Sequence, residues 1–434
     1  MTAKPTEAAR LTDSAPPAPP PVLGHSSSDL RRMYLLIAVG LFVVSLGQPG
    51  VIGQLPFLFL FKNQFHLNAA EQANLFAIAT FAWYIKPLAG LVCDGLPLFG
   101  TRRRSYLILS STLASVIWLL FAVAPRTYGS FFGLLVLLNT AMVFASTTIG
   151  GILVEAGQEG GATGRLASVR YAIDMIISVI TGPLGGWLAA RSFGWTAGIG
   201  ACLMATLVPL TPVLVKEDRV RHAERAVWSV AGAQLRLIAR SQSMWWASAM
   251  LFLVFVAPGF GIALRYYQQD TLNFSTQLIG RLQALGGVAG IVATILYAMA
   301  CKKIPLKALL LGGILLNAAS SVLYLWYRTP GSAMVIDSAN GFLGILGILP
   351  LFDLAARATP KGSESFGYAL LMSVYNIAVF AVSNPVGSWL YELQQVGWHH
   401  NLSRLVWLNT GTSLLALVLL PLLPKAAFVS ANPA

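Results

Sequence analysis

Long apolar runs begin at Tyr34 and continue almost to the C-terminus of this chain. Twelve of them reach about 20 residues or more, the length of helix that crosses the apolar core of a bilayer. Only 10% of the 434 residues are charged, whereas ordinary soluble proteins carry about 25%. The chain therefore has too little polar surface for a water-soluble globule. It is predicted to be an all-α integral membrane protein, which excludes soluble enzymes, disordered chains and disulfide-stapled secreted domains.

The expected spans divide into two sets of six. They cover residues 34–61, 71–96, 105–124, 130–155, 167–190, 195–215, 244–267, 277–300, 307–327, 333–356, 364–391 and 404–424. We expect an N-terminal half at 34–215, a cytoplasmic linker at 216–243 and a C-terminal half at 244–424. Residues 1–33 are expected as a disordered, proline-rich cytoplasmic tail, and 425–434 as a second tail. Six spans, a basic linker and six more spans form the layout of the major facilitator fold.

The distribution of Lys and Arg predicts the orientation in the membrane. With both termini inside, the cytoplasmic segments hold 20 Lys and Arg residues and the outer loops hold five, as the positive-inside rule requires. We interpret the net charge of +13 in this way and expect no nucleic-acid partner. The predicted location is the inner (plasma) membrane, as a multi-pass protein with both termini in the cytoplasm.

The segment between spans two and three combines a glycine, an acid and three bases. Gly90 allows close helix packing, and Asp94 lies near the cytoplasmic surface. Arg102, Arg103 and Arg104 follow it. Such a cluster can hold an inner gate closed in one state and release it in another. The alternative is that the arginines only determine topology.

Two stretches carry a resemblance to a known family. The first runs from Trp83 to Tyr106 and reads W-x-x-K-P-L-x-G-x-x-x-D-x-x-P-L-F-G-x-R-R-R-S-Y. The second covers residues 349–376 in the other half, and a shorter match follows at 397–402. These stretches resemble the folate–biopterin transporters, a branch of the major facilitator superfamily. The resemblance implies a secondary transporter with a folate, a pterin or a similar anionic heteroaromatic compound as its substrate.

Lys86 is the most informative single residue of the predicted site. It lies about ten residues from the inner end of span two, or roughly 15 Å at 1.5 Å per residue. A charge at this depth costs about 2.5–3.5 kcal/mol, so it normally faces a cavity or a partner. We expect Lys86 to contact an acidic group of the substrate, with Trp83, Tyr84 and Asn376 supplying a stacking face and hydrogen bonds. The alternative is a structural pair between Lys86 and an acid in another span, with Asp174 as the candidate partner.

Span five holds a second candidate pair. Arg170 and Asp174 are four residues apart and therefore share a helix face. Arg170 is a candidate substrate contact and Asp174 a candidate proton carrier, unless the two residues simply pair with each other. Span four departs from the family, because Ser146 and Gly150 stand where the resemblance predicts aspartates. The resemblance therefore predicts membership of the family, and the loss of these aspartates separates that prediction from a shared substrate.

Three further charged residues are assigned to the inner gate. Glu155 ends span four and is expected to join Arg102–Arg104. Asp353 and Arg357 end span ten and form either the counterpart of that network or a local pair. Near the outer ends of spans seven and eight, Arg265 and Arg281 either snorkel to the interface or serve as an outer gate or attract an anionic substrate. Asp337, near the outer end of span ten, is their candidate partner.

The sequence thus predicts a proton-coupled symporter that works by alternating access. Its expected partners are a small-molecule substrate, protons and the lipid bilayer, and it is expected to be a monomer. No Walker A pattern, cofactor motif or metal-ligand spacing is present in the sequence. The alternatives are a major facilitator transporter of another metabolite or drug and, in another class, a polytopic membrane enzyme.

Overall fold

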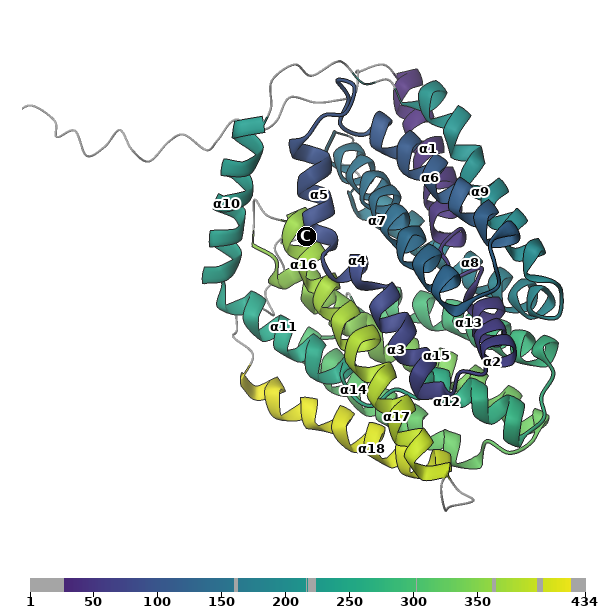
Figure 1. The fold of residues 1–434 in the computed structure, drawn as a ribbon. Helices are drawn as coiled ribbons and strands as arrows, with labels where there is room; N and C mark the ends of the chain where they lie inside the picture. Colours follow the sequence, from purple (N-terminus) through teal and green to yellow (C-terminus); the bar gives the residue numbers. More distant parts are fainter. Residues whose placement is uncertain are drawn as a thin grey trace, which may run out of the picture.

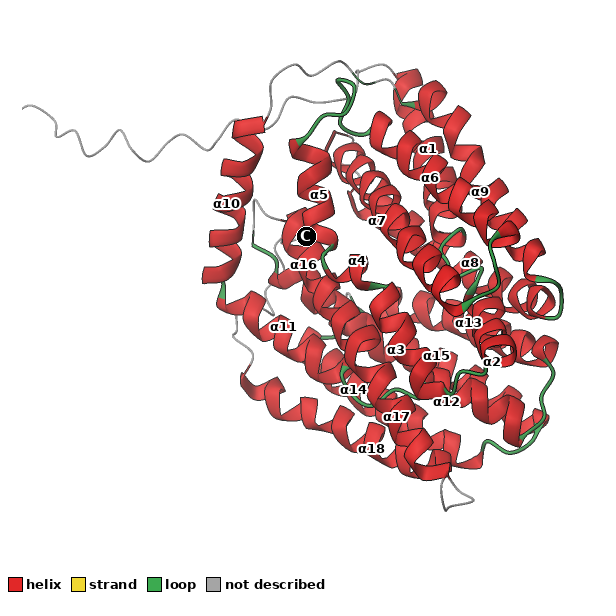
Figure 2. Ribbon diagram, in the orientation of Figure 1, coloured by secondary structure: helices red, strands yellow, loops and turns green. Residues whose placement is uncertain are grey.

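The computed structural model describes residues 27–159, 163–215, 217, 224–301, 303–360, 364–395 and 401–422, and its regular elements in these ranges are helices joined by short loops. Helices run diagonally across the molecule, and the described residues contain no β-strand (Figures 1 and 2). Residues 1–26 of the predicted tail (1–33) and the residues after 422 lie outside this description. The first helix begins at Ser27, so residues 27–33 are helical and the prediction of a disordered tail is wrong for them.

The N-terminal half contains the first six spans, two of which are interrupted. Its helices are α1 (Ser27–Leu46), α2 (Gln54–Phe65), α3 (Ala69–Ala79), α4 (Phe81–Tyr84), α5 (Lys86–Gly95), α6 (Arg104–Val123), α7 (Tyr128–Glu159), α8 (Thr163–Ala189) and α9 (Phe193–Leu214). Span one consists of α1 and α2, and span two consists of α3, α4 and α5. Interrupted spans are typical of transporters, where the breaks lie near the substrate site.

The C-terminal half follows an amphipathic helix, α10 (Glu224–Arg240), which packs against α5 of one half and α11 and α16 of the other. Its helices are α11 (Gln242–Phe255), α12 (Gly261–Tyr266), η2 (Tyr267–Thr271), α13 (Thr276–Ala300), α14 (Leu306–Val322), η3 (Leu323–Trp326), α15 (Pro330–Ala358), α16 (Glu364–Asn376), η4 (Ile377–Ser383), α17 (Asn384–Gln395), α18 (Asn401–Leu415) and η5 (Ala416–Leu422). The segments η2 and η4 are π-helical, whereas η3 and η5 are 3₁₀ helices.

All twelve predicted spans coincide with helices. Eight helical stretches in the described residues are long and apolar enough to cross a membrane. Three shorter apolar helices, at 37–46, 173–189 and 242–255, and the interrupted run α3–α5 account for the other four predicted spans. The protein is therefore an all-α membrane protein with two six-helix halves, as the sequence predicts.

The two halves have separate apolar cores and join along two lines. One buried cluster lies within residues 37–215 and another within 238–420. Between the halves, α8 packs on α13, and α3 packs on α17. The contact between α8 and α13 needs glycine, because a Cβ atom on Gly182 would lie 2.4 Å from the Gly280 oxygen. Small residues allow such close helix packing in membranes.

One end of the molecule closes between the halves. This end carries residues 62–68 and 271–275, and we call it the outer end, after the predicted orientation. Apolar residues of both halves form mixed clusters here, for example Ala69 of α3 with Ala263, Tyr266 and Tyr391. Such contacts exclude water from the space between the halves at this end.

Candidate functional site

The interruption of span two positions the first site residues. Thr80 and Ile85 leave the regular helical conformation, and a new helix, α5, begins at Lys86. Pro87 occupies its first turn, where a missing N–H group costs little because no helical partner exists there. Trp83 and Lys86 therefore flank a helix break within the span.

Lys86 and Trp83 lie together against α7. The Lys86 Nζ atom donates a hydrogen bond to the Ser146 Oγ atom at 2.9 Å. It also lies 5.1 Å from the centre of the Trp83 ring, within the range of a cation–π contact. The Trp83 Nε1 atom donates to the Asn139 Oδ1 atom at 2.9 Å, which orients the indole. The sequence predicted Lys86 and Trp83 but did not indicate Asn139.

Asn376 reaches the same region from the opposite half. Its Nδ2 atom lies 3.4 Å from the Trp83 carbonyl oxygen. Asn376 ends α16, and the π-helical segment η4 follows directly. Tyr84 points elsewhere, since its hydroxyl donates to the Ala77 carbonyl of its own span at 2.7 Å. The structure thus brings Lys86, Trp83 and Asn376 together, and these three residues form what we call the central cluster.

The candidate pair of span five is described only in part. The Asp174 Oδ1 atom accepts a hydrogen bond from the Ser45 hydroxyl at 3.4 Å. Ser45 lies in the last turn of α1, immediately before the interruption of span one. The side chain of Arg170 lies outside the described residues, so the predicted pair between Arg170 and Asp174 is not described.

At the inner end, Glu217 binds the segment of three arginines. Its Oε1 atom accepts from the Arg102 N–H group at 2.6 Å, and its Oε2 atom accepts from the Arg103 and Arg104 N–H groups at 3.0 and 2.9 Å. The carboxylate therefore caps the N-terminus of α6, where unpaired N–H groups and the helix dipole favour an anion. The sequence analysis did not single out Glu217.

Arg103 continues this network to α7. Its side chain is buried, and a Cβ atom on Gly151 would lie 2.4 Å from the Arg103 Cζ atom. Gly151 thus leaves space for the guanidinium, one helical turn before Glu155. The side chains of Glu155 and Asp94 lie outside the described residues. Gly90 makes an ordinary contact with α7, because a Cβ atom on this glycine would lie 3.5 Å from the Thr147 methyl group.

In the second half, Asp353 and Arg357 form a bidentate ion pair. The Arg357 Nε and Nη2 atoms each lie 2.9 Å from an Asp353 oxygen. The Tyr297 hydroxyl approaches the same carboxylate at 3.5 Å. Both charged residues belong to α15, so this geometry matches the local pair that the sequence analysis left open.

Polar contacts between the halves gather at the outer end, and we call them the outer gate. Lys62 of α2 binds Asp270 and Gln269 of η2, at 2.8 Å for Gln269. The Glu392 Oε1 atom of α17 accepts from the Ala69 N–H group at 2.8 Å. The sequence analysis did not predict these pairs, since their partners are more than 200 positions apart in the chain.

Tyr266 adds to the outer gate from α12. Its hydroxyl lies 2.8 Å from the Gln72 Oε1 atom of α3, and its ring lies 4.6 Å beneath the Lys62 Nζ atom. The contacts of the outer gate therefore link α2 and α3 of one half with α12, η2 and α17 of the other.

The comparison with family models decides what kind of protein this is. The model of the BT1 family matches residues 50–432, nearly the whole chain.

The chain belongs to the BT1 family.

Named relatives agree with this assignment. A folate-biopterin transporter from Synechocystis is 28% identical over 401 residues, covering 86% of this chain and 79% of that one. A probable folate-biopterin transporter 2 from Arabidopsis thaliana is 25% identical over 429 residues, covering 92% and 84% of the two chains. The resemblance that the sequence motifs indicated is confirmed.

Solved structures place this BT1 protein in the major facilitator fold. A D-xylose–proton symporter covers 92% of the chain, with a TM-score of 0.67 and 16% identity, and the chain covers 98% of that protein. The nucleoside transporter NupG covers 93%, with a TM-score of 0.66 and 12% identity, and 99% of it is covered. These neighbours establish the fold, and together with the family they identify a membrane transporter.

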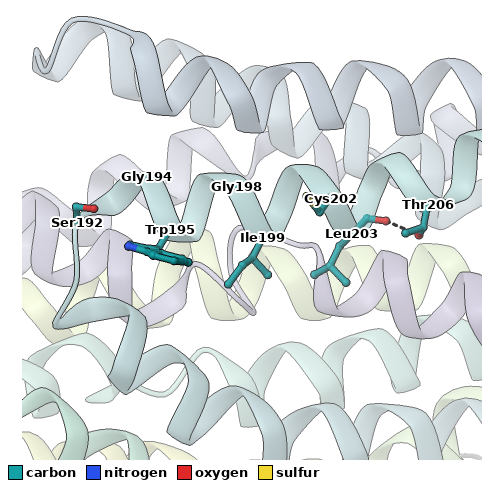
Figure 3. Close-up of a pocket in the computed structure, with 8 residues that line it drawn as sticks. All are labelled: Ser192, Gly194, Trp195, Gly198, Ile199, Cys202, Leu203 and Thr206. Atoms are coloured by element: carbon teal, nitrogen blue, oxygen red, sulfur yellow. Dashed lines mark hydrogen bonds between the residues drawn. The ribbon is translucent and has the colours of Figure 1, made fainter.

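A groove on this BT1 protein lies away from the central cluster. It has a volume of about 570 Å³ and is lined by Ser192 and seven residues of α9 (Figure 3). All of its lining residues come from one helix and the residue before it, and Trp195 is 55% exposed in a predicted span. None of these residues belongs to the central cluster, so we do not assign the substrate to this groove.

Proposed function

We propose that this protein transports a folate, a pterin or a similar anionic heteroaromatic compound by proton-coupled alternating access. One observation carries the substrate class: a cationic amine and an indole lie side by side at the break of span two. The indole offers a face for a flat ring, and the amine offers a counter-charge for a carboxylate. The names of the Synechocystis and Arabidopsis relatives support the same class.

The central cluster also supports alternating access. Lys86 and Trp83 belong to the N-terminal half, whereas Asn376 belongs to the C-terminal half and contacts the Trp83 backbone. A substrate bound between them would contact both halves and thus favour one arrangement over another. In this scheme Arg170 is a further substrate contact and Asp174 carries the proton, whereas Tyr84, whose hydroxyl bonds within its own span, is not assigned to the substrate.

The inner gate is assigned to the segment after span two. Gly90, Asp94, Glu155 and Arg102–Arg104 would hold it closed in one state. The local pair of Asp353 and Arg357 would lie on the second-half side of this gate. The contacts of Glu217 with the backbone of this segment support the assignment, because they connect it to the end of span six.

Uptake into proteoliposomes tests the proposal. Labelled folate, biopterin and p-aminobenzoyl-glutamate separate the two recognition elements, since folate carries both the pterin ring and the acid. We expect folate uptake that increases when the outside is acidic and that unlabelled pterins inhibit. If none of the three compounds is taken up, the proposed substrate class is contradicted. If uptake does not change with an imposed proton gradient, the proposed proton coupling is contradicted.

A further inference from the structure

The π-helical turn η2 is held on two sides. Toward the N-terminal half, its residues Gln269 and Asp270 bind Lys62 in the outer gate. Toward the interior of the C-terminal half, its Gln268 is fully buried and donates a hydrogen bond to the Tyr327 hydroxyl. Single π-helical turns are uncommon and often occur at functional sites. This turn therefore connects the outer gate to a buried network.

The buried network ends on a carboxylate in span ten. Asp337 is the eighth residue of α15, about 11 Å along that helix at 1.5 Å per residue. Its Oδ2 atom accepts from the Tyr327 hydroxyl at 2.7 Å, and its Oδ1 atom accepts from the Tyr324 hydroxyl at 3.1 Å. Both tyrosines come from the end of span nine and are buried.

Two neighbouring elements act on this carboxylate. The tyrosines of span nine donate to it directly, and Arg265 of α12 is the positive charge that acts on it electrostatically. Arg265 also donates to the Gln268 Oε1 atom at 3.0 Å. Helix α13 packs on the backbone of Asp337 instead, because a Cβ atom on Gly286 would lie 3.1 Å from the Asp337 main-chain oxygen.

The hydrogen bonds of the network have a consistent direction. Arg265 donates to Gln268, Gln268 donates to Tyr327, and Tyr327 donates to Asp337. An ionised carboxylate fits this order, because it accepts at both oxygens. When a proton binds at the Oδ2 atom, that oxygen becomes a donor, and the Tyr327 proton loses its acceptor. A buried donor without an acceptor is costly, so the bonds around Tyr327 and Gln268 must rearrange.

We propose that Asp337 is a proton-binding residue, and that its protonation releases η2 and thereby opens the outer gate. The inference rests on the proposed proton-coupled transport and adds a titrating group in the C-terminal half, where nothing else has been assigned to the proton. The step adds one proton from the outer aqueous phase to the Asp337 carboxylate and needs no other reactant. Asp174 lies in the other half, so mutation can separate the two carboxylates.

Distances across the outer gate test the proposal directly. Spin labels at Asn63 of α2 and Gln277 of α13, both exposed at the outer end, report the separation of the halves in a cysteine-free background. The protein is measured in lipid nanodiscs without substrate, across a pH titration. In the wild type, we expect the longer distances to gain population as the pH falls. In Asp337→Asn, we expect them to dominate at every pH.

Matched variants distinguish Asp337 from the acids of the outer gate itself. Asp270→Asn and Glu392→Gln weaken the gate but leave the network intact, so both should keep the pH response. Asp174→Asn should also keep it. The proposal is overturned if Asp337→Asn keeps the wild-type response, or if Asp270→Asn or Glu392→Gln abolishes it.

A milder variant covers the case in which Asp337→Asn fails to fold. Tyr327→Phe preserves the buried ring and the carboxylate but removes the link to Gln268, so the distances should respond weakly to pH. An unchanged response in Tyr327→Phe would also overturn the proposal. The distance measurement needs neither substrate nor a proton gradient. It therefore tests the role of Asp337 separately from the proposed transport, which the uptake assay tests.

Discussion

The Nζ atom of Lys86 lies 2.9 Å from the hydroxyl oxygen of Ser146 and donates a hydrogen bond to it. Ser146 is one of two positions in span four where the resemblance to folate–biopterin transporters predicts an aspartate. A carboxylate at this distance would form an ion pair with the lysine. The serine instead provides a neutral acceptor, so residue 146 adds no negative charge beside Lys86.

Ser146→Asp should therefore weaken the binding of an anionic substrate. The new carboxylate would compete with the substrate for Lys86, and we expect folate affinity to fall about tenfold or more, equivalent to about 1.4 kcal/mol. Ser146→Ala is the matched control, since it removes the hydrogen bond without adding charge. Binding is measured by isothermal titration of the purified protein. Equal affinities in the two variants would argue against a role for the charge of Lys86.

Lys86→Ala should separate the substrates by charge. We expect it to abolish uptake of folate and p-aminobenzoyl-glutamate but to retain uptake of biopterin, which lacks a carboxylate. Lys86→Arg should restore folate uptake only in part, because a planar guanidinium does not replace a compact ammonium. Expression and membrane insertion of each variant are checked on blots and by fluorescence of a fused reporter.

A double variant tests the structural alternative for Lys86. If this lysine only neutralises Asp174, Lys86→Ala leaves a carboxylate without its partner, and the change of both residues to Ala should recover stability and transport together. Recovery of transport would remove Lys86 from the substrate site. A stable double variant that remains inactive would support a transport role for both residues.

The membrane spans and the residues of the central cluster could be predicted from the sequence. Apolar length predicts a span because the bilayer allows few alternatives to a helix. Lys86 was identifiable for the same reason, since a charge at mid-depth needs a special environment. Trp83 and Asn376 were proposed because of their residue types. The structure places Trp83 beside Lys86 and Asn376 against the Trp83 backbone.

The contacts of the outer gate and the cap on α6 could not be predicted from the sequence. Lys62 and Asp270 lie in polar segments near span ends, where single charges are common, and no local pattern indicates that they meet. Glu217 was one of several charges in the basic segment after span six. Its role depends on how closely this segment approaches the start of α6 in the folded protein. Hydrophobic periodicity does not predict such a contact between distant parts of the chain.

The membrane orientation remains a separate prediction from charge. Both termini and the segment 216–243 should face the cytoplasm, because 20 Lys and Arg residues would then lie inside and five outside. A cysteine at His222 should react with an impermeant maleimide only after the cells are opened. A cysteine at Arg126, in a predicted outer loop, serves as the reciprocal control. Labelling of the first position in sealed cells would reverse the assignment.

Glu217→Gln should weaken the cap on α6 and disturb the inner gate. The carboxylate accepts hydrogen bonds from three consecutive backbone N–H groups. The neutral amide retains one acceptor oxygen and loses the favourable interaction with the helix dipole, which is worth about 0.3–1 kcal/mol at an exposed site. We expect a lower melting temperature and a greater reactivity of inner-side cysteine probes, because the segment 96–104 would be less firmly held.

Glu217→Asp separates the charge from the reach of the side chain. It retains the carboxylate on a shorter side chain, so it should restore part of the stability if the charge at the helix N-terminus matters. A loss in Glu217→Asp as large as in Glu217→Gln would mean that the position of both oxygens decides the effect. If neither variant alters stability or probe reactivity, the contact has no part in holding the gate, and the inner gate would then depend on Arg103, whose guanidinium fills the space beside Gly151.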